Sequence, residues 1–245
     1  MKKSRIYGLI GKNIDYSFSK KYFSKKFEVE NLDCIYSNFD IKNLSQIESV
    51  LQKDEISGFN VTIPYKEEII KFLDEIDEVA TAIGAVNTIK KIHNKNIGFN
   101  TDCIGFEKSI LSLISDKKPK NALILGAGGA SKAIKYVLKK LNINYKTVSR
   151  DKGKSEFIYE NLDNEIINRF QLIINCSPVG TFPKIKKCPN IPYESLTKEH
   201  ILYDLVYNPI ETLFLKKGRE LGCKTKNGFE MLKIQADESW GIWNY

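Results

Sequence analysis

The stretch Ala122-Leu123-Ile124-Leu125-Gly126-Ala127-Gly128-Gly129-Ala130-Ser131-Lys132-Ala133 decides the fold of this 245-residue chain. Its first four residues are apolar and predict a buried strand, and the residues after the glycines continue in a helical pattern. Glycines allow a tight turn between strand and helix, and the backbone N–H groups at the helix start favour the pyrophosphate of a dinucleotide. An ordinary structural turn is the alternative. We expect the turn to bind a cofactor through Gly126, Ala127, Gly128, Gly129 and Ala130.

The end of the next predicted strand, at residues 145–149, indicates which cofactor binds. The chain continues Ser149-Arg150-Asp151-Lys152-Gly153-Lys154. An arginine here suits the 2′-phosphate of NADP, whereas an acidic residue would hydrogen-bond the ribose 2′-hydroxyl of NAD. Ser149 and Arg150 are therefore predicted to bind NADP. Asp151 leaves NAD as an alternative, and an ordinary basic surface loop is another.

Short apolar runs alternate with helical patterns along the chain, which predicts an α/β fold with mostly parallel sheets. Strands are expected at residues 6–10, 34–39, 59–63, 122–125, 145–149, 172–175 and 201–205. Helices are expected at residues 44–51, 104–114 and 130–141. The polar residues 115–120 are expected to form a linker ahead of the glycine-rich strand.

Composition limits the functions that the chain can have. The 38 basic and 30 acidic residues give a net charge of +8, but the basic residues are spread along the chain instead of clustering as in nucleic-acid-binding proteins. Five cysteines without a C-x-x-C pair and only two histidines indicate neither disulfides nor a metal site. No apolar run has the length of a signal peptide or membrane span. We expect a cytoplasmic protein with no metal, nucleic-acid or membrane partner.

A polar cluster is predicted in the first half of the chain. Asn60 and Thr62 alternate with apolar residues, so their side chains share one face of the expected strand. Pro64 suits the first turn of a helix over residues 65–70, which would contain Lys66. A lysine in such a place can donate or accept a proton, whereas an exposed surface lysine is the alternative.

Three further places carry polar residues beside apolar patterns. Asp102 directly precedes a helical pattern, so it is either a helix cap or a functional carboxylate. Asn87 shares a strand face with apolar residues and must bond within the core or face a ligand. Ser17 and Ser19 precede a predicted helix, where Ser19 could be the N-cap.

These segments, in their order along the chain, resemble the shikimate dehydrogenase family. Besides the serine pair, the resemblance rests on residues 8–11, 58–66, 84–88, 100–102, 126–130, 174–180, 203–212, 227–232 and 235–236. The chain departs from the family where Tyr16 and Lys20 replace a histidine and a proline around the serine pair. It also has Ser149-Arg150-Asp151 where the family commonly has Asn-Arg-Thr.

The resemblance implies reversible hydride transfer between NADPH and 3-dehydroshikimate, giving shikimate on the route to chorismate and the aromatic amino acids. Lys66 and Asp102 would form the catalytic pair, with Lys66 moving the proton. The substrate would be bound by Ser17, Ser19, Asn60, Thr62, Asn87, Tyr207 and Gln235. The nicotinamide would be bordered by Leu205, Gly228 and Glu78.

The same resemblance implies two domains. Residues 1–102 with 228–245 would bind the substrate, and residues 103–227 would form the Rossmann-type NADP-binding domain. The C-terminal helix is expected to return to the first domain, with Trp240 and Trp243 as core anchors. Lys66 and Asp102 are expected to meet in a groove between the domains. We expect a monomer or a homodimer.

Other functions stay open at this point. An NAD-preferring quinate or shikimate dehydrogenase differs from the first hypothesis in its cofactor and in one polyol. A non-catalytic nucleotide or metabolite sensor could use the same scaffold, although it would not need both Lys66 and Asp102. A basic nucleic-acid binder is suggested by the net charge alone.

Overall fold

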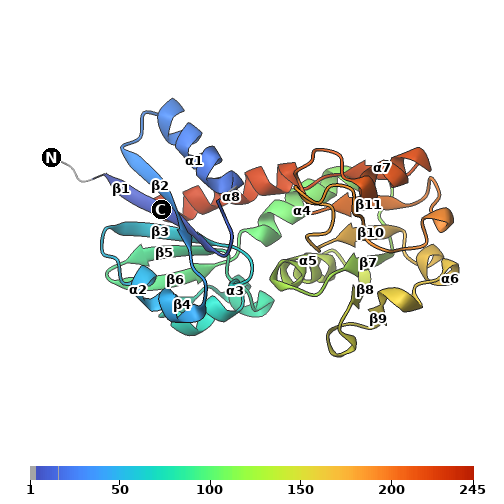
Figure 1. Cartoon of the computed structure of the whole chain (residues 1–245), viewed down its shortest axis with the longest axis horizontal. Coiled ribbons are helices and arrows are strands. Elements are labelled where there is room, and N and C mark those ends of the chain that lie inside the picture. Colours follow the sequence, from blue (N-terminus) through green and yellow to red (C-terminus); the bar gives the residue numbers. More distant parts are fainter. Residues whose placement is uncertain (1–3, 16) are drawn as a thin grey trace. The chain divides into compact units, whose positions relative to one another are not determined.

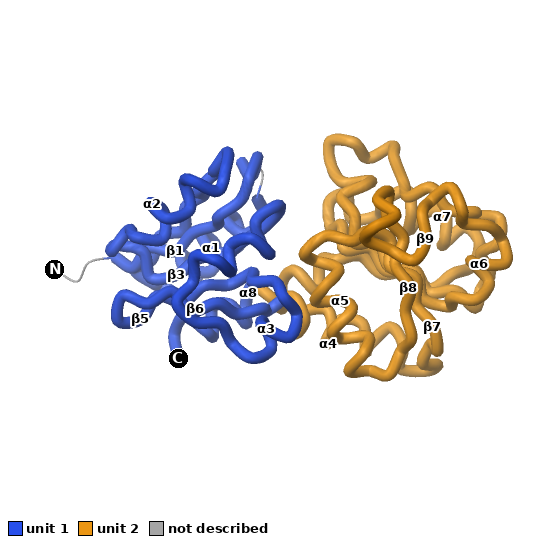
Figure 2. The backbone as a smooth tube through the Cα atoms, turned by 90° about the horizontal axis from the view of Figure 1, so that it is seen from below, with its two compact units in different colours: residues 1–101, 236–245 blue, residues 102–235 orange. Residues whose placement is uncertain are grey.

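Two six-stranded sheets, each with its own helices, organise the residues that the computed structural model describes, 4–15 and 17–245 (Figure 1). Unit 1 contains residues 1–101 and 236–245, and unit 2 contains residues 102–235 (Figure 2). Tyr16 lies outside the described residues. The α/β fold is thereby confirmed, whereas the functions assigned to the two domains stay predictions.

The sheet of unit 1 has the strand order β2-β1-β3-β5-β6-β4. Strands β1, β2 and β3 pair in parallel, β5 pairs antiparallel to both β3 and β6, and β4 pairs in parallel with β6. The strands are β1 (Arg5–Gly11), β2 (Cys34–Asp40), β3 (Ile56–Val61), β4 (Glu75–Ile76), β5 (Thr88–Ile92) and β6 (Lys95–Phe99).

Strands β5 and β6 form a hairpin that the sequence analysis did not anticipate. His93 and Asn94 connect the two strands, with φ angles of 47° and 64°. Left-handed residues at both positions match the twist of a two-residue hairpin turn. The short strand β4 was also not anticipated.

The helices of unit 1 are mostly short. The pattern at 44–51 becomes a 3-10 turn, η1 (Leu44–Gln46), followed by a short α-helix. The α-helices are α1 (Phe18–Val29), α2 (Ile47–Leu51), α3 (Glu78–Ile83) and the last turns of α8 (Phe229–Asn244); a second 3-10 segment is η2 (Glu68–Phe72).

Strand β1 lies between two apolar clusters because successive side chains of a strand point to opposite faces. Ile10 belongs to one cluster, while Tyr7 and Leu9 belong to the other. The second cluster includes Trp243 from α8, whose ring stacks on Tyr7 at a centroid distance of 4.6 Å. The Trp243 indole N–H donates to the carbonyl oxygen of Ile89, at 2.9 Å.

The predicted roles of the two tryptophans are confirmed. Trp243 is 6 % exposed, and Trp240 packs edge-on against Tyr7. A side chain at Gly58 would meet the Trp243 indole nitrogen at 2.5 Å, so a glycine at this position makes room for the ring. The C-terminal helix therefore supplies part of the core of unit 1.

The sheet of unit 2 is entirely parallel, with the strand order β12-β11-β10-β7-β8-β9. This is the strand order of a doubly wound dinucleotide-binding fold. The chain adds β8 and β9 on one side of β7, and then adds β10, β11 and β12 on the other side. The strands are β7 (Asn121–Leu125), β8 (Asn144–Ser149), β9 (Phe157–Ile158), β10 (Leu172–Asn175), β11 (Ile201–Asp204) and β12 (Lys224–Lys226). Strands β9 and β12 were not anticipated.

Helices connect the strands of unit 2. Residues 115–120 form an irregular connection inside unit 2, between α4 and β7, and do not separate the units. The α-helices are α4 (Asp102–Leu113), α5 (Gly129–Lys140), α6 (Asn164–Asn168), α7 (Leu213–Glu220) and the start of α8; the 3-10 segments are η3 (Lys152–Lys154), η4 (Tyr159–Asn161) and η5 (Tyr193–Ser195).

Replacement of Trp243 tests how much the C-terminal helix contributes to unit 1. We expect Trp243→Ala to lower the free energy of unfolding by about 3–5 kcal/mol, because it removes a buried ring and leaves the Ile89 carbonyl without this donor. Tyr245→Ala, at a fully exposed residue of the same chain end, should stay within about 0.5 kcal/mol. Urea denaturation measures both, and equal effects would show that the helix end is not anchored by Trp243.

Candidate functional site

The glycine-rich turn of unit 2 lies where the strand order reverses. Gly126 follows β7 with φ +115°, and a side chain there would come within 3.2 Å of the backbone of Cys176 and Ser177. Only glycine adopts this conformation readily and allows this approach. Gly128 is the N-cap of α5, and a side chain there would meet nothing within 4 Å. The turn is therefore open beside the helix start and fits a dinucleotide pyrophosphate.

The loop after β8 contains the predicted cofactor selectors. Ser149 accepts a hydrogen bond from the backbone N–H of Asp151, at 3.0 Å. The Asp151 carboxylate accepts from the backbone N–H of Gly153, at 2.9 Å, and pairs with Lys154 at 3.6 Å. Arg150 is exposed at the end of the strand. The acidic side chain is thus engaged within its own loop, while the arginine faces solvent.

Leu205 and Gly228, predicted to border the nicotinamide, lie together in unit 2. A side chain at Gly228 would overlap the carbonyl oxygen of Leu205, and the Gly228 N–H donates to the carbonyl of Val206 at 3.2 Å. The loop after β11 therefore packs directly on the start of α8. Tyr207 is half-buried in the same loop.

Asp102 and Gln235 lie on two helices of unit 2 that pack closely. Asp102 is the first residue of α4 and is 6 % exposed. One turn later, a side chain at Gly105 would meet the Met231 carbonyl at 2.6 Å and the Gln235 Cβ at 3.2 Å. Gln235 is buried, and its amide donates to the carbonyl of Leu232. The structure thus brings the regions of Asp102 and Gln235 together within one unit.

Lys66 is not in a helix, so the helix predicted over residues 65–70 is wrong. Residues 63–67 form turns, and the first regular turn is the 3-10 segment η2. The Lys66 carbonyl accepts from the backbone N–H of Val86, at 2.7 Å, instead of from a residue one turn later. This bond places Lys66 beside the segment that leads to Asn87, and the side chain of Lys66 is half-buried.

Asn60 is buried near the end of β3 and uses both ends of its amide within unit 1. Its oxygen accepts from the Tyr36 hydroxyl at 2.8 Å. Its nitrogen donates to the Ser239 hydroxyl at 3.0 Å and to the Thr88 hydroxyl and the Asn87 carbonyl at 3.3 Å. Asn60 is therefore held by four groups of the fold.

Asn87 forms hydrogen bonds within the core, which was one of the two alternatives expected for it; the other was contact with a ligand. Its oxygen accepts from the Thr101 backbone N–H at 2.7 Å, and its nitrogen donates to the Thr101 hydroxyl at 2.9 Å. The Thr88 hydroxyl lies 3.2 Å from the Asn87 oxygen. These bonds fix the orientation of the amide at 2 % exposure.

The remaining predicted residues of unit 1 occupy three different environments. Ser17, not Ser19, is the N-cap of α1, because its hydroxyl accepts from the Ser19 N–H at 3.1 Å. Thr62 directly follows β3, is half-buried and donates its backbone N–H to Ile10. Glu78 is exposed at the start of α3.

Tyr36, Thr88 and Ser239 were missed by the sequence analysis. Burial raises the pKa of the Tyr36 hydroxyl, while a hydrogen bond with Ser19 acts in the opposite direction. Ser19, Tyr36 and Asn60 therefore form one chain of polar groups. Thr88 and Ser239 are fully buried, and their hydroxyls lie 2.8 Å apart.

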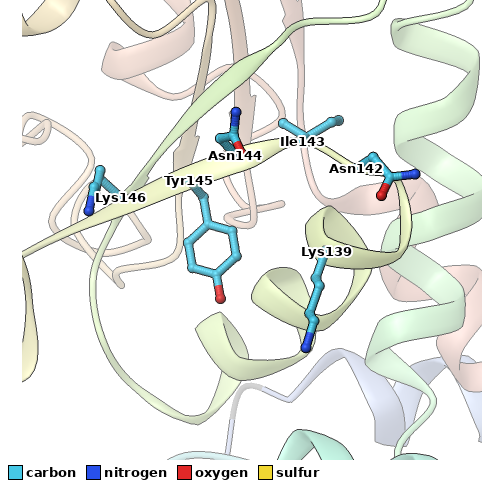
Figure 3. Close-up of a pocket in the computed structure, with 6 residues that line it drawn as sticks. All are labelled: Lys139, Asn142, Ile143, Asn144, Tyr145 and Lys146. Carbon is cyan, nitrogen blue, oxygen red and sulfur yellow. The ribbon is translucent and has the colours of Figure 1, made fainter.

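A separate surface depression lies away from the predicted site (Figure 3). Its lining comes from the connection between α5 and β8, at the strand end opposite the glycine turn, and consists of Lys139, Asn142, Ile143, Asn144, Tyr145 and Lys146. Among the residues the structure describes, no cluster of three metal-ligating side chains occurs. None of the helices in residues 4–15 and 17–245 is long and apolar enough to span a membrane.

The fold and the open turn define a two-unit α/β protein with a Rossmann-type nucleotide-binding sheet. Residues 9–89 match a family model described as the shikimate dehydrogenase substrate binding domain. A protein of Methanococcus aeolicus named shikimate dehydrogenase (NADP(+)) is 38 % identical over 257 residues, covering 98 % of this chain and 92 % of its own. The chain belongs to the shikimate dehydrogenase family.

Solved structures of related enzymes share the fold. Shikimate 5-dehydrogenase from Thermus thermophilus, in complex with NADP(H) and shikimate, is 28 % identical with a TM-score of 0.84, over 98 % of this chain and 93 % of its own. Quinate dehydrogenase from Corynebacterium glutamicum, in complex with NAD, is 25 % identical with a TM-score of 0.87, over 98 % and 94 %.

Replacement of Asn60 tests the polar chain in unit 1. We expect Asn60→Ala to lower the free energy of unfolding by about 2–4 kcal/mol, because the buried Tyr36 hydroxyl loses its acceptor and Ser239 its donor. Thr62→Ala, two residues later and half-buried, should cost less than about 1 kcal/mol. Urea denaturation compares the two variants. An Asn60 variant as stable as the Thr62 variant would contradict a structural role for these bonds.

Proposed function

We propose that this chain is an NADP-dependent shikimate dehydrogenase, which transfers hydride reversibly between NADPH and the ring carbonyl of 3-dehydroshikimate to give shikimate. The observation that carries the proposal is similarity over 98 % of the chain to a protein named for this activity. Retention of both Lys66 and Asp102 supports an enzyme over a non-catalytic sensor, since a sensor needs no proton donor. The product would enter chorismate and aromatic amino acid biosynthesis.

Most of the predicted cofactor-binding residues lie in unit 2, whereas Glu78 lies in unit 1. The turn of Gly126–Ala130 and the start of α5 would receive the pyrophosphate, because backbone N–H groups and the helix dipole favour an anion there. Ser149 and Arg150 would receive the 2′-phosphate, and Leu205, Gly228 and Glu78 would border the nicotinamide. When bound, NADPH supplies the hydride.

The substrate carries a carboxylate and several hydroxyls, which suit hydrogen-bonding side chains more than apolar ones. We assign this binding to the predicted residues Ser17, Ser19, Asn60, Thr62, Asn87, Tyr207 and Gln235. The bonds already made by Asn60 mean that much of its contribution is to orient neighbouring groups. Ser17 and Ser19, at the start of α1, are the anion-binding candidates because the helix start favours negative charge.

Lys66 and Asp102 would manage the proton. Reduction of a ketone leaves negative charge on its oxygen, and a nearby ammonium stabilises that charge. Lys66 would then deliver a proton to the oxygen as the general acid, and accept it in the reverse direction. Asp102 would orient the lysine and a substrate hydroxyl. We further propose that the enzyme acts in the cytoplasm as a monomer or homodimer.

Replacement of Lys66 tests the proposal. Wild-type protein should oxidise NADPH when 3-dehydroshikimate is added, and Lys66→Ala should lower kcat by about 10³-fold because the general acid is lost. Lys71→Ala, at an exposed lysine of η2, is the matched control and should keep wild-type activity. Absorbance at the NADPH band measures the rate. Full activity in the Lys66 variant would remove this residue from the mechanism.

An NAD-preferring quinate or shikimate dehydrogenase is the second candidate, and the similarity to the quinate dehydrogenase solved with NAD favours it. Asp151 is engaged within its own loop, which supports NADP because the ion pair with Lys154 offsets part of the charge that would repel a 2′-phosphate.

Specificity constants for both cofactors and both polyols distinguish the two candidates. We expect NADP and shikimate to be preferred, and Arg150→Ala to weaken use of NADP by about tenfold with little change for NAD, because only NADP carries the phosphate that the arginine binds. A wild-type preference for NAD and quinate would establish the second candidate.

A further inference from the structure

Asp204 is a fully buried carboxylate at the end of β11 that the proposed chemistry does not use. One of its oxygens accepts from the Asn175 amide at 2.9 Å and from the Val206 backbone N–H at 3.0 Å. The other accepts from the Thr212 hydroxyl at 2.6 Å. One side chain thus connects the ends of two neighbouring strands with the residue that caps α7.

Asn175 extends these contacts to the loop after β10. Its oxygen accepts from the Ser177 backbone N–H at 3.0 Å and from the Ser177 hydroxyl at 2.6 Å. Its nitrogen, besides bonding Asp204, donates to the Val179 carbonyl at 3.3 Å. The loop that begins at Cys176 is therefore folded around Asn175, which is itself fully buried.

Both loops touch the parts of unit 2 assigned to the cofactor. The backbone of Ser177 lies against Gly126 of the glycine turn. On the other side, Val206 accepts from the N–H of Gly228, which packs on Leu205. Asp204 is thus the centre of a continuous set of contacts from the phosphate-binding turn to the residues assigned to the nicotinamide.

The surroundings of Asp204 leave its charge dependent on these hydrogen bonds. Burial raises its pKa to about 6, although the bonds from Thr212, Val206 and Asn175 act in the opposite direction. The charge of Asp204 acts on three titratable groups and raises the pKa of each: Cys176, Tyr193 and Tyr203. Thiols and phenols have no cationic form, so none of these three groups neutralises the carboxylate.

We propose that Asp204 is a positioning residue for the dinucleotide: its carboxylate holds the loops after β10 and β11 in the arrangement that receives the cofactor. The inference rests on the proposed function, because it concerns the cofactor site of that enzyme. Asp204 makes no contact with the cofactor in this role and acts through Asn175, Val206 and Thr212. Cofactor affinity therefore depends on a network outside the glycine turn.

The first test replaces the charge with an amide of the same shape. In Asp204→Asn one carboxylate oxygen becomes an amide donor, so a single neutral oxygen remains to accept from Asn175, Val206 and Thr212, and we expect the Kd for NADPH to rise by about tenfold. Fluorescence titration of NADPH measures it directly. Shikimate binding without cofactor, measured by calorimetry, should weaken less than NADPH binding, because Tyr207 is the one assigned substrate residue in these loops. Glu211→Gln, at an exposed carboxylate of the same loop that pairs with Arg219, is the control and should bind NADPH as the wild type does.

A second pair of variants keeps the proposal testable if Asp204→Asn does not fold. Thr212→Val removes the hydroxyl that donates to Asp204, whereas Thr212→Ser retains it. We expect weaker NADPH binding in the valine variant and recovery to near the wild-type Kd in the serine variant.

The outcomes separate this inference from the proposed function. Wild-type affinity for NADPH in a folded Asp204→Asn, or equal affinities in the two Thr212 variants, would overturn the positioning role while leaving the enzyme assignment intact. Equal loss of NADPH and shikimate binding in Asp204→Asn would also overturn it, because that pattern indicates general unfolding. A wild-type protein that binds no NADPH would instead reject the proposed function together with this inference.

Discussion

The predicted site residues of each unit depend on one constraint: polar side chains buried at strand ends must find hydrogen-bond partners inside the fold. In unit 1, the amide of Asn60 joins β3 to the last turns of α8 through Ser239. In unit 2, the carboxylate of Asp204 joins the loops after β10 and β11. The Asn60–Ser239 and Asp204–Asn175 bonds connect residues 179 and 29 positions apart, and a partner that moved away would leave a buried polar group unpaired. The loops that carry the predicted site residues are therefore limited to few arrangements.

The parts of the fold that were predicted correctly are those whose signal is local. The strand before Gly126 and the helix after it were expected at 122–125 and 130–141, and they occupy Asn121–Leu125 and Gly129–Lys140. Apolar period, glycines and helix start all lie within about twenty residues there, so tertiary contacts had little to change. The predicted helix at Lys66 failed for the opposite reason. The Lys66 carbonyl accepts from Val86, which lies beyond α3 on a separate segment, so the bond that a helix would have needed is replaced by a tertiary one.

The missed members of the polar network show what a single sequence does not reveal. The Thr88 and Ser239 hydroxyls meet although the residues are 151 positions apart, and neither residue is unusual by itself. A weak signal existed, because Ser239 lies at helical spacing between Ala236 and Trp243, both of which are buried. A small polar residue on an apolar helix face needs a partner, but its identity depends on the register of α8 against the sheet. Motifs were enough to propose the named site residues, whose roles stay predictions, whereas the groups that orient them gave no motif signal.

The buried charge of Asp204 lowers the free energy of unfolding at neutral pH. The presence of a carboxylate at this position therefore needs a reason other than stability. Its pKa is raised from 3.8 to about 6 in the folded protein. An acid with a higher pKa in the folded state stabilises the protein fully below about pH 4, and that stabilisation is lost as the pH rises through about 6. The shift corresponds to about 3 kcal/mol at neutral pH. Three donors converge on this side chain. A neutral or apolar residue would avoid the free-energy cost of the buried charge, but it would leave those donors without a strong acceptor. Stability alone therefore does not explain the carboxylate, whereas fixing two loops beside the glycine turn does.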